Sequence, residues 1–286
     1  MRFLLINHHP DCLYYQHEAL QHLGHEVVVA DEMLNRTLTP DNSSSTRDGH
    51  FHVAGKLFPI SKWNFSPEFV SNVEDDDVIV TIHGDVAGQQ SLSTHKVIMD
   101  IRNHHWLHRI KYGNNTTLVT NHLTFGKDQG VKYIPNYVEP KPIRENPKYV
   151  VTINSSPASL TSSAAHEFGE IMISVGNHPG SVVDDEKLLN DTCMFVYESV
   201  GGIHYYAVNK ALNMGIPVYM DRNTYEDGGF TDLPEDLFIF SEQYTPRDAY
   251  NKALTLDPVD IQKGYQQNLN LENTSKTLGA LLENIL

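Results

Sequence analysis

The chain has 286 residues and a mass of 32.3 kDa, with 40% hydrophobic and 20% charged residues. This length suits two domains of about 140 residues each, and the composition excludes disordered and collagen-like proteins. The longest apolar runs, at 3–6 and 27–30, are far shorter than the roughly 18 residues that a membrane helix needs. Since no signal-peptide pattern precedes the first strand, we expect a cytoplasmic protein without a membrane partner.

The formal net charge of −15 is divided unequally along the chain, with −3 in residues 1–150 and −12 in residues 151–286. Thirteen of the 16 histidines lie in the first of these two parts. The first part could therefore present a mildly basic face to an anionic partner, whereas an ordinary solvated surface explains the same residues.

The N-terminal residues predict a strand at 3–6, a helix at 14–23 that ends at Gly24, and a second strand at 25–31. Continuous apolar strands joined by a helix are typical of a parallel sheet that is covered on both faces. The segment 36–50 is rich in Thr, Ser, Asn and Asp, and predicts a mobile surface loop.

Four further strands are predicted in the first half, at 78–82, 96–101, 117–120 and 131–134. Ligands of open α/β sheets bind beyond the carboxyl ends of the strands, so the polar residues that follow these strands are where we expect chemistry. Four prolines between 135 and 147 indicate an interdomain linker. We therefore expect an N-terminal domain at 1–145 and a C-terminal domain at 146–286.

The second half repeats this alternation. It predicts strands at 149–153, 170–175, 193–197, 216–220 and 238–240, helices at 162–168, 184–189 and 205–213, and a mostly helical segment at 248–286. The fold class that we predict is α/β, with two Rossmann-like domains and C-terminal helices.

The chain lacks the sequence motifs of the common cofactor and metal sites. It contains no GxGxxG after a strand, no phosphate-binding loop of the GxxxxGKS/T type and no HExxH. Cys12 and Cys193 are far apart and predict buried thiols. We expect neither a metal nor a cofactor.

Three segments together resemble the GT-B glycosyltransferases. They are YIPNYVEP at the end of the first half, Gly201-Gly202 after the apolar run CMFVY, and KALNMGIPV at 210–218. The resemblance implies two Rossmann-like domains that face each other across a cleft, with a nucleotide-sugar donor held mostly by the second domain. It also implies transfer without a metal.

The same resemblance implies the donor-binding residues. The backbone N–H groups of Gly201 and Gly202, at a helix N-terminus, would face the diphosphate; a plain loop before a packing helix is the alternative. Lys210 stands where these families carry a ribose-binding glutamate, so the ribose contact either passes to Glu198 or is lost. The remaining donor-site candidates are Ser155, Ser156, His178 and His204.

A narrower likeness covers DVIVTIHGD at 77–85 and HKVIMDIRNHHW at 95–106, which resemble the phage DNA β-glucosyltransferases. It implies a UDP-sugar such as UDP-glucose as donor, a hydroxymethylated base of bacteriophage DNA as acceptor, and Asp100 as the general base. The alternatives for Asp100 are a salt bridge with Arg102 or a helix cap. Asp85 is the second candidate for the base.

A cationic and aromatic cluster follows Asp100. Its members are Arg102, His104, His105, Trp106, Arg109 and Lys111. The basic side chains could contact the phosphates of double-stranded DNA, and a base could stack on Trp106. An amphipathic helix that buries Trp106, Leu107 and Ile110 would account for these residues equally well.

The function that we predict is glycosyl transfer from a nucleotide-sugar to a hydroxyl group, with DNA modification as the favoured role. The segment 154–159 lacks the phosphate-binding arginines of the phage enzymes, and the pI of 5.4 is low for a DNA enzyme. Three alternatives therefore remain: a GT-B enzyme with another acceptor, a nucleotide-sugar epimerase, and a degenerate protein that only binds nucleotide or DNA.

Overall fold

A computed structural model describes most of the chain. The described residues are 1–6, 10–29, 44–46, 50–53, 56–59, 73–82, 94–101, 114–121, 130–137, 139–145, 147–154, 159–176, 189–198 and 205–286. They form two compact units: unit 1 comprises Met1–Asn136 and Leu271–Leu286, and unit 2 comprises Tyr137–Asn270. None of the described helices has the length and apolar character needed to span a membrane.

Unit 1 contains a six-stranded parallel sheet. Its order is β2 (Glu26–Val29), β1 (Arg2–Ile6), β6 (Val78–Ile82), β7 (Lys96–Asp100), β8 (Thr116–Thr120) and β9 (Lys132–Tyr133). The strands predicted for the first half are confirmed, because each apolar run is long enough for a buried strand and too short for a helix.

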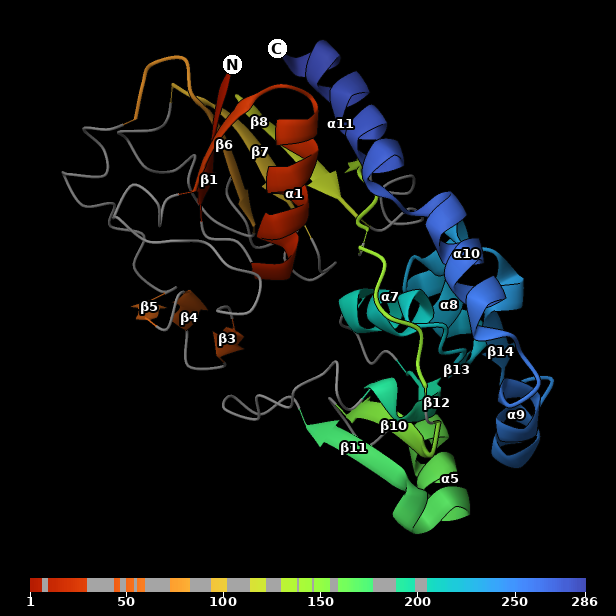
Figure 1. The fold of residues 1–286 in the computed structure, drawn as a ribbon. Coiled ribbons are helices and arrows are strands. Elements are labelled where there is room, and N and C mark those ends of the chain that lie inside the picture. Colours follow the sequence, from red (N-terminus) through yellow and green to blue (C-terminus); the bar gives the residue numbers. More distant parts are fainter. Residues whose placement is uncertain are drawn as a thin grey trace. The chain divides into compact units, whose positions relative to one another are not determined.

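Two helices that are distant in the sequence pack together in unit 1. Helix α1 (Pro10–His22) and the C-terminal helix α11 (Leu271–Ile285) lie side by side (Figure 1). Leu20 of α1 shares a core with Leu278 and Leu282 of α11 and with strand residues such as Ile98. The sequence division assigned 271–286 to the second domain, whereas this shared core places α11 in unit 1.

A small antiparallel sheet occupies part of the segment that we predicted to be a loop. Strand β3 (Ser44–Thr46) pairs with β4 (His50–Val53), which pairs with β5 (Lys56–Pro59). The loop prediction was therefore wrong for 44–46 and for His50. The polar strand β3 carries no hydrophobic signal of its own and is ordered by backbone pairing with β4, in which Phe51 lies opposite Phe58 of β5.

Unit 2 contains a five-stranded parallel sheet in the order β11 (Met172–Gly176), β10 (Tyr149–Asn154), β12 (Thr192–Val196), β13 (Val218–Met220) and β14 (Phe238–Phe240). Its helices are α5 (Ser159–Phe168), α7 (Tyr205–Asn213), α8 (Arg222–Asp227), α9 (Pro246–Ala253) and α10 (Pro258–Asn268), with 3₁₀ turns at Gly169–Ile171, Phe230–Asp232 and Glu235–Leu237. These elements confirm the predicted second alternation, except that most of the expected helix at 184–189 lies outside the described residues.

The proline-rich segment after β9 is attached to unit 2. The buried side chain of Arg144 donates to the carbonyl oxygens of Thr192, at 3.1 Å, and Cys193, and burial lowers the pKa of this guanidinium. The side chain of Asn213 donates to the carbonyl of Glu139. These contacts explain why unit 2 begins at Tyr137 rather than at the boundary near 145 that the prolines indicated.

Gly215 ends α7 in a conformation that only glycine adopts easily. Its φ is +73°, and a Cβ atom built on it would lie 2.5 Å from both the Cβ and the carbonyl oxygen of Pro258, the first residue of α10. The backbone of α10 can therefore approach the end of α7 only because residue 215 has no side chain.

We predict that Gly215→Ala lowers the free energy of unfolding by about 2–4 kcal/mol, because it combines left-handed strain with overpacking. Gly24→Ala is the matched control, since Gly24 has a φ of +80° and a Cβ atom added there would meet no other atom within 4 Å. The control should lose only about 1 kcal/mol. Urea denaturation of both variants measures the difference, and equal losses would contradict the close approach of α10.

Candidate functional site

The topology of each sheet defines where a ligand would bind. The strand order reverses between β1 and β6 in unit 1, and between β10 and β12 in unit 2. All strands within each of these sheets are parallel, so their carboxyl ends share one edge. Open α/β sheets bind ligands at this edge, next to the point of reversal.

Asp100 lies at the carboxyl edge of the unit 1 sheet. It is the last residue of β7, is 2% exposed, and accepts a hydrogen bond of 3.1 Å from Nε2 of Gln16. Gln16 belongs to α1, the helix that follows β1. The predicted general base is thus a buried carboxylate that is oriented by a neutral donor from α1, the helix that follows β1.

Glu198 lies at the corresponding place in unit 2. It follows β12 by two residues, and its Oε2 accepts hydrogen bonds from the backbone N–H groups of Leu160, at 2.8 Å, and Thr161, at 3.1 Å. These groups belong to the first turn of α5, whose N–H groups have no partner inside the helix. The carboxylate therefore joins the end of β12 to the start of α5 and complements the α5 dipole.

The structure describes only some of the predicted site residues. Asp100, Glu198 and Lys210 are described, and Lys210 lies in the last turn of α7. The other candidates, Asp85, Arg102, His104, His105, Trp106, Arg109, Lys111, Ser155, Ser156, His178, Gly201, Gly202 and His204, lie outside the described residues. The roles of all these residues, described or not, remain predictions.

Two parts of the site were missed by the sequence analysis. Gln16 is a polar residue on the buried face of α1, because Ala19 and Leu20, three and four residues later, are both in the core. A polar residue at such a position needs a buried hydrogen-bond partner, so the sequence pattern could have identified Gln16. The amides of α5 carry no side-chain signal, since backbone groups are the same in every sequence.

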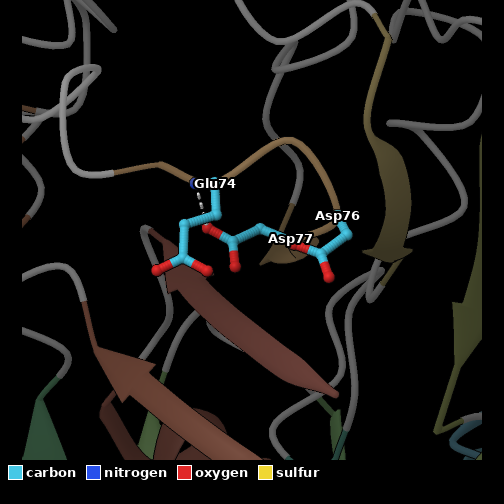
Figure 2. A group of neighbouring side chains, drawn as sticks. All are labelled: Glu74, Asp76 and Asp77. Atoms are coloured by element: carbon cyan, nitrogen blue, oxygen red, sulfur yellow. Dashed lines mark hydrogen bonds between the residues drawn. The ribbon is translucent and has the colours of Figure 1, made fainter.

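A group of acidic side chains lies at the opposite, amino edge of the unit 1 sheet. Glu74, Asp76 and Asp77 precede β6, and one oxygen from each lies within 4.8 Å of the others (Figure 2). Carboxylates at this spacing could in principle share a cation. Asp77 directly precedes β6, whose carboxyl end is Ile82. The acidic group therefore lies at the edge of the sheet opposite to Asp100.

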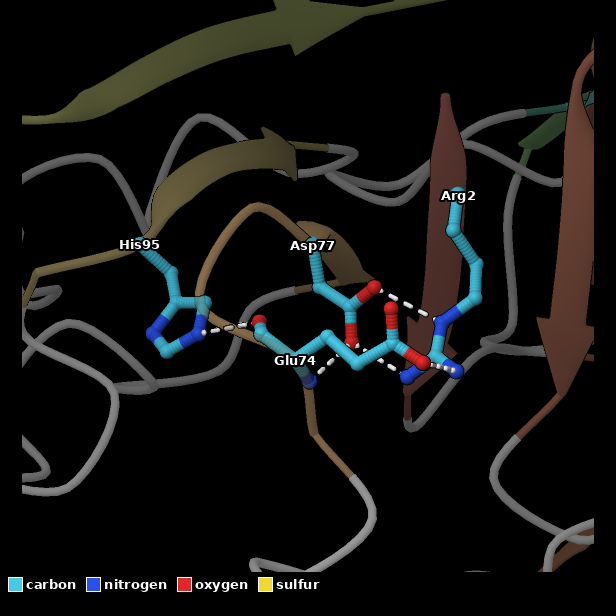
Figure 3. Close-up of polar contacts among 4 residues, drawn as sticks. All are labelled: Arg2, Glu74, Asp77 and His95. Carbon is cyan, nitrogen blue, oxygen red and sulfur yellow. Dashed lines mark hydrogen bonds and ion pairs between the residues drawn. The ribbon is translucent and has the colours of Figure 1, made fainter.

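Arg2 already neutralises two members of this group. Its Nε and Nη2 donate to the two carboxylate oxygens of Asp77, both at 2.7 Å, and its Nη1 donates to Oε1 of Glu74 at 2.6 Å (Figure 3). The hydrogen bond with Asp77 raises the pKa of Arg2. Nε2 of His95 donates to the carbonyl of Glu74 at 3.0 Å. We interpret the group as an ion pair that joins the starts of β1 and β6.

We predict that Arg2→Met lowers the free energy of unfolding by about 2–3 kcal/mol, because it leaves the buried carboxylate of Asp77 without its cation. Glu74→Gln removes the exposed member of the same network and should cost less than about 0.5 kcal/mol. Chemical denaturation at neutral pH measures both values. If the group were a metal centre instead, a chelator would destabilise the wild type and would have no effect on Glu74→Gln.

No protein-family model and no curated protein sequence matches this chain. Among solved structures, AviGT4, a glycosyltransferase involved in avilamycin A biosynthesis, is 13% identical with a TM-score of 0.58, over 100% of this chain and 97% of that one. Sucrose-phosphate synthase from Thermosynechococcus elongatus is 14% identical with a TM-score of 0.55, over 100% and 99%. TarM is 11% identical with a TM-score of 0.50, over 87% of this chain and 63% of that one.

These similarities confirm the predicted GT-B fold class, with two parallel-sheet α/β units. At 11–14% identity they show the fold alone. The narrower likeness to the phage DNA glucosyltransferases remains a prediction.

Proposed function

We propose that this protein is a glycosyltransferase that moves a sugar from a nucleotide-sugar donor, such as a UDP-sugar, to a hydroxyl group. The observation that carries the proposal is the fold match over the whole chain to AviGT4, a glycosyltransferase, and to sucrose-phosphate synthase. The carboxylates at the carboxyl edges of both sheets support it, because they offer a proton acceptor and an acceptor for ligand hydroxyl groups.

The donor is assigned to unit 2. The carboxylate of Glu198 is held in place by two backbone N–H groups, and such a fixed acceptor can bind a ribose or sugar hydroxyl group at little entropic cost. The amides of Gly201 and Gly202 are expected to receive the diphosphate at the start of α7. Lys210 would add positive charge on the same helix.

Asp100 is assigned the role of general base. In the transfer step the acceptor oxygen forms a bond to the anomeric carbon, the bond from that carbon to the diphosphate breaks, and the hydroxyl proton passes to the carboxylate. The nucleoside diphosphate leaves with the electron pair of the broken bond. Gln16 would keep the carboxylate oriented, as a positioned base requires. No step is assigned to a metal, so transfer should persist in the presence of a chelator.

The favoured acceptor is a hydroxymethylated base in phage DNA, which would place the protein in the host cytoplasm. The sequence likeness around Asp100 supports this choice, together with the basic and aromatic residues from Arg102 to Lys111. The decisive assay supplies UDP-glucose with a labelled sugar and duplex DNA that contains 5-hydroxymethylcytosine. Label should enter this DNA and not unmodified DNA. Release of free sugar without labelled DNA would contradict the proposed acceptor. Formation of an epimerised donor would contradict glycosyl transfer itself.

We predict that Asp100→Asn lowers kcat in this assay by about 10²–10⁴, with donor affinity within about twofold of the wild type, because the amide keeps the shape but cannot accept the proton. The control is Asp76→Asn, which removes the same charge from the exposed turn at the amino edge. Near-normal turnover in Asp100→Asn, or an equal loss in the control, would make Asp100 a structural residue.

We predict that Glu198→Gln weakens donor binding about tenfold, because one charge-assisted hydrogen bond becomes a neutral one. The amide oxygen can still accept from α5, so stability should change little. Glu198→Ala should weaken donor binding as well and should also lower the free energy of unfolding by about 1 kcal/mol, because it removes the cap of α5. Calorimetric titration with UDP-glucose, with the exposed Glu170→Gln as control, measures the effect. Wild-type affinity in Glu198→Gln would show that the residue only caps α5.

A further inference from the structure

A pocket with a volume of about 680 Å³ opens along the carboxyl edge of the unit 2 sheet, beyond the ends of β13 and β14. Its walls come from Leu160 of α5, from Asp221 directly after β13, from 241–244 after β14, and from the first turn of α9. Small-molecule sites commonly measure about 300–1,000 Å³. Leu160 is the only residue that the pocket shares with the hydrogen bonds of Glu198. A ligand in the pocket would therefore contact a different set of side chains.

The charged residues of the pocket are all acidic. Asp221, Glu242 and Asp248 line it, and none of its lining residues is Lys, Arg or His. The guanidinium of Arg222, which comes next in the chain after Asp221, pairs with Glu235 at 2.9 and 3.0 Å and lies 4.3 Å from the ring centre of Phe240. The pocket therefore repels phosphate and other anions.

The carboxylates of Glu242 and Asp248 keep capacity for further donors. Glu242 accepts from the backbone N–H of Arg222 at 2.9 Å, and Asp248 accepts from the hydroxyl of Thr245 at 2.7 Å. Each carboxylate has about four lone-pair sites, so these bonds leave others available. The three groups do not approach one another within 4.8 Å as the Glu74 group does, which favours an extended organic ligand over one shared metal ion.

The remaining walls suit a hydroxylated ligand. Tyr219 is only 1% exposed, and its hydroxyl donates to the carbonyl of Tyr244 at 2.9 Å, which anchors Tyr244, the half-buried aromatic residue of the lining. Burial, and to a smaller extent Glu242, raises the pKa of Tyr219 to about 12, so this phenol remains neutral. Ser163, Asn223 and other neutral polar side chains complete the lining. Aromatic surface beside several hydrogen-bonding groups is able to bind a sugar ring and its hydroxyl groups.

We propose that this pocket binds a hydroxylated organic amine of monosaccharide or disaccharide size, of which an amino sugar is the simplest example. The protonated amine would bind to the exposed carboxylate of Glu242 or Asp248, and the hydroxyl groups would bond to the neutral polar side chains. The inference does not rest on the proposed glycosyl transfer, because the pocket residues differ from Glu198 and from the predicted diphosphate site.

The test is calorimetric titration with four probes at low and high salt: glucosamine, glucose, glucose 6-phosphate and putrescine. Glucosamine should bind, and its affinity should fall as salt screens the carboxylates. Glucose and putrescine should each bind at least about fivefold more weakly, because each lacks one of the two features that the pocket recognises. Glucose 6-phosphate should show no binding.

Matched variants locate the binding. Glu242→Gln combined with Asp248→Asn should weaken glucosamine binding by about fivefold or more, whereas Asp260→Asn, on the exposed side of α10, should leave it unchanged. Asp221 is left intact because it caps α8 by accepting from the backbone N–H of Thr224 at 2.6 Å. Both side chains changed in the double variant are exposed, so the fold should persist, which a thermal melt verifies.

Three outcomes would overturn the proposal: absence of glucosamine binding, binding of glucose 6-phosphate as tight as that of glucosamine, and unchanged affinity in the double variant. Glu198→Gln separates this pocket from the proposed donor site, since it should weaken UDP-glucose and leave glucosamine unaffected. A wild-type protein that binds glucosamine but no nucleotide-sugar would count against the transferase proposal alone.

Discussion

Parallel strand pairing is the constraint on which both units depend. Each parallel strand must be followed by a connection that returns to the start of the next one, so every carboxyl end lies at one edge and every amino end at the other. In unit 1 this separates Asp100, which ends β7, from Asp77, which precedes β6. In unit 2 it gathers Glu198, the start of α5 and the acidic pocket at a single edge.

The partners of the carboxylates differ between these two edges. At the amino edge of unit 1, a guanidinium binds Asp77 through two parallel hydrogen bonds, an arrangement that neutralises the carboxylate and joins two strands. At the carboxyl edges, Gln16 binds Asp100, and the amides of Leu160 and Thr161 bind Glu198. Neutral donors orient a carboxylate while leaving its charge in place, which suits the proton-accepting role proposed for Asp100 and the hydroxyl-binding role proposed for Glu198.

Packing between distant segments also determines which residues belong to each unit. Helix α11 is separated from α1 by most of the chain, yet the two share the core that contains Leu20 and Leu281. In unit 2, Gly215 allows Pro258 to approach the end of α7, and the side chain of Gln262 on α10 donates to the carbonyls of Lys141 and Asn213. The linker, α7 and α10 are therefore one packed assembly.

The sequence by itself determined the strands, the main helices and the fold class, because continuous apolar runs between polar turns report burial through local periodicity alone. It also placed Asp100 and Glu198 at the ends of strands, where α/β sheets bind ligands. Only the tertiary structure decided that α11 belongs to unit 1, that Gln16 orients Asp100 and that Glu198 binds α5. These features depend on contacts between residues 16 and 100, or 160 and 198, and local patterns carry no information about partners so far apart.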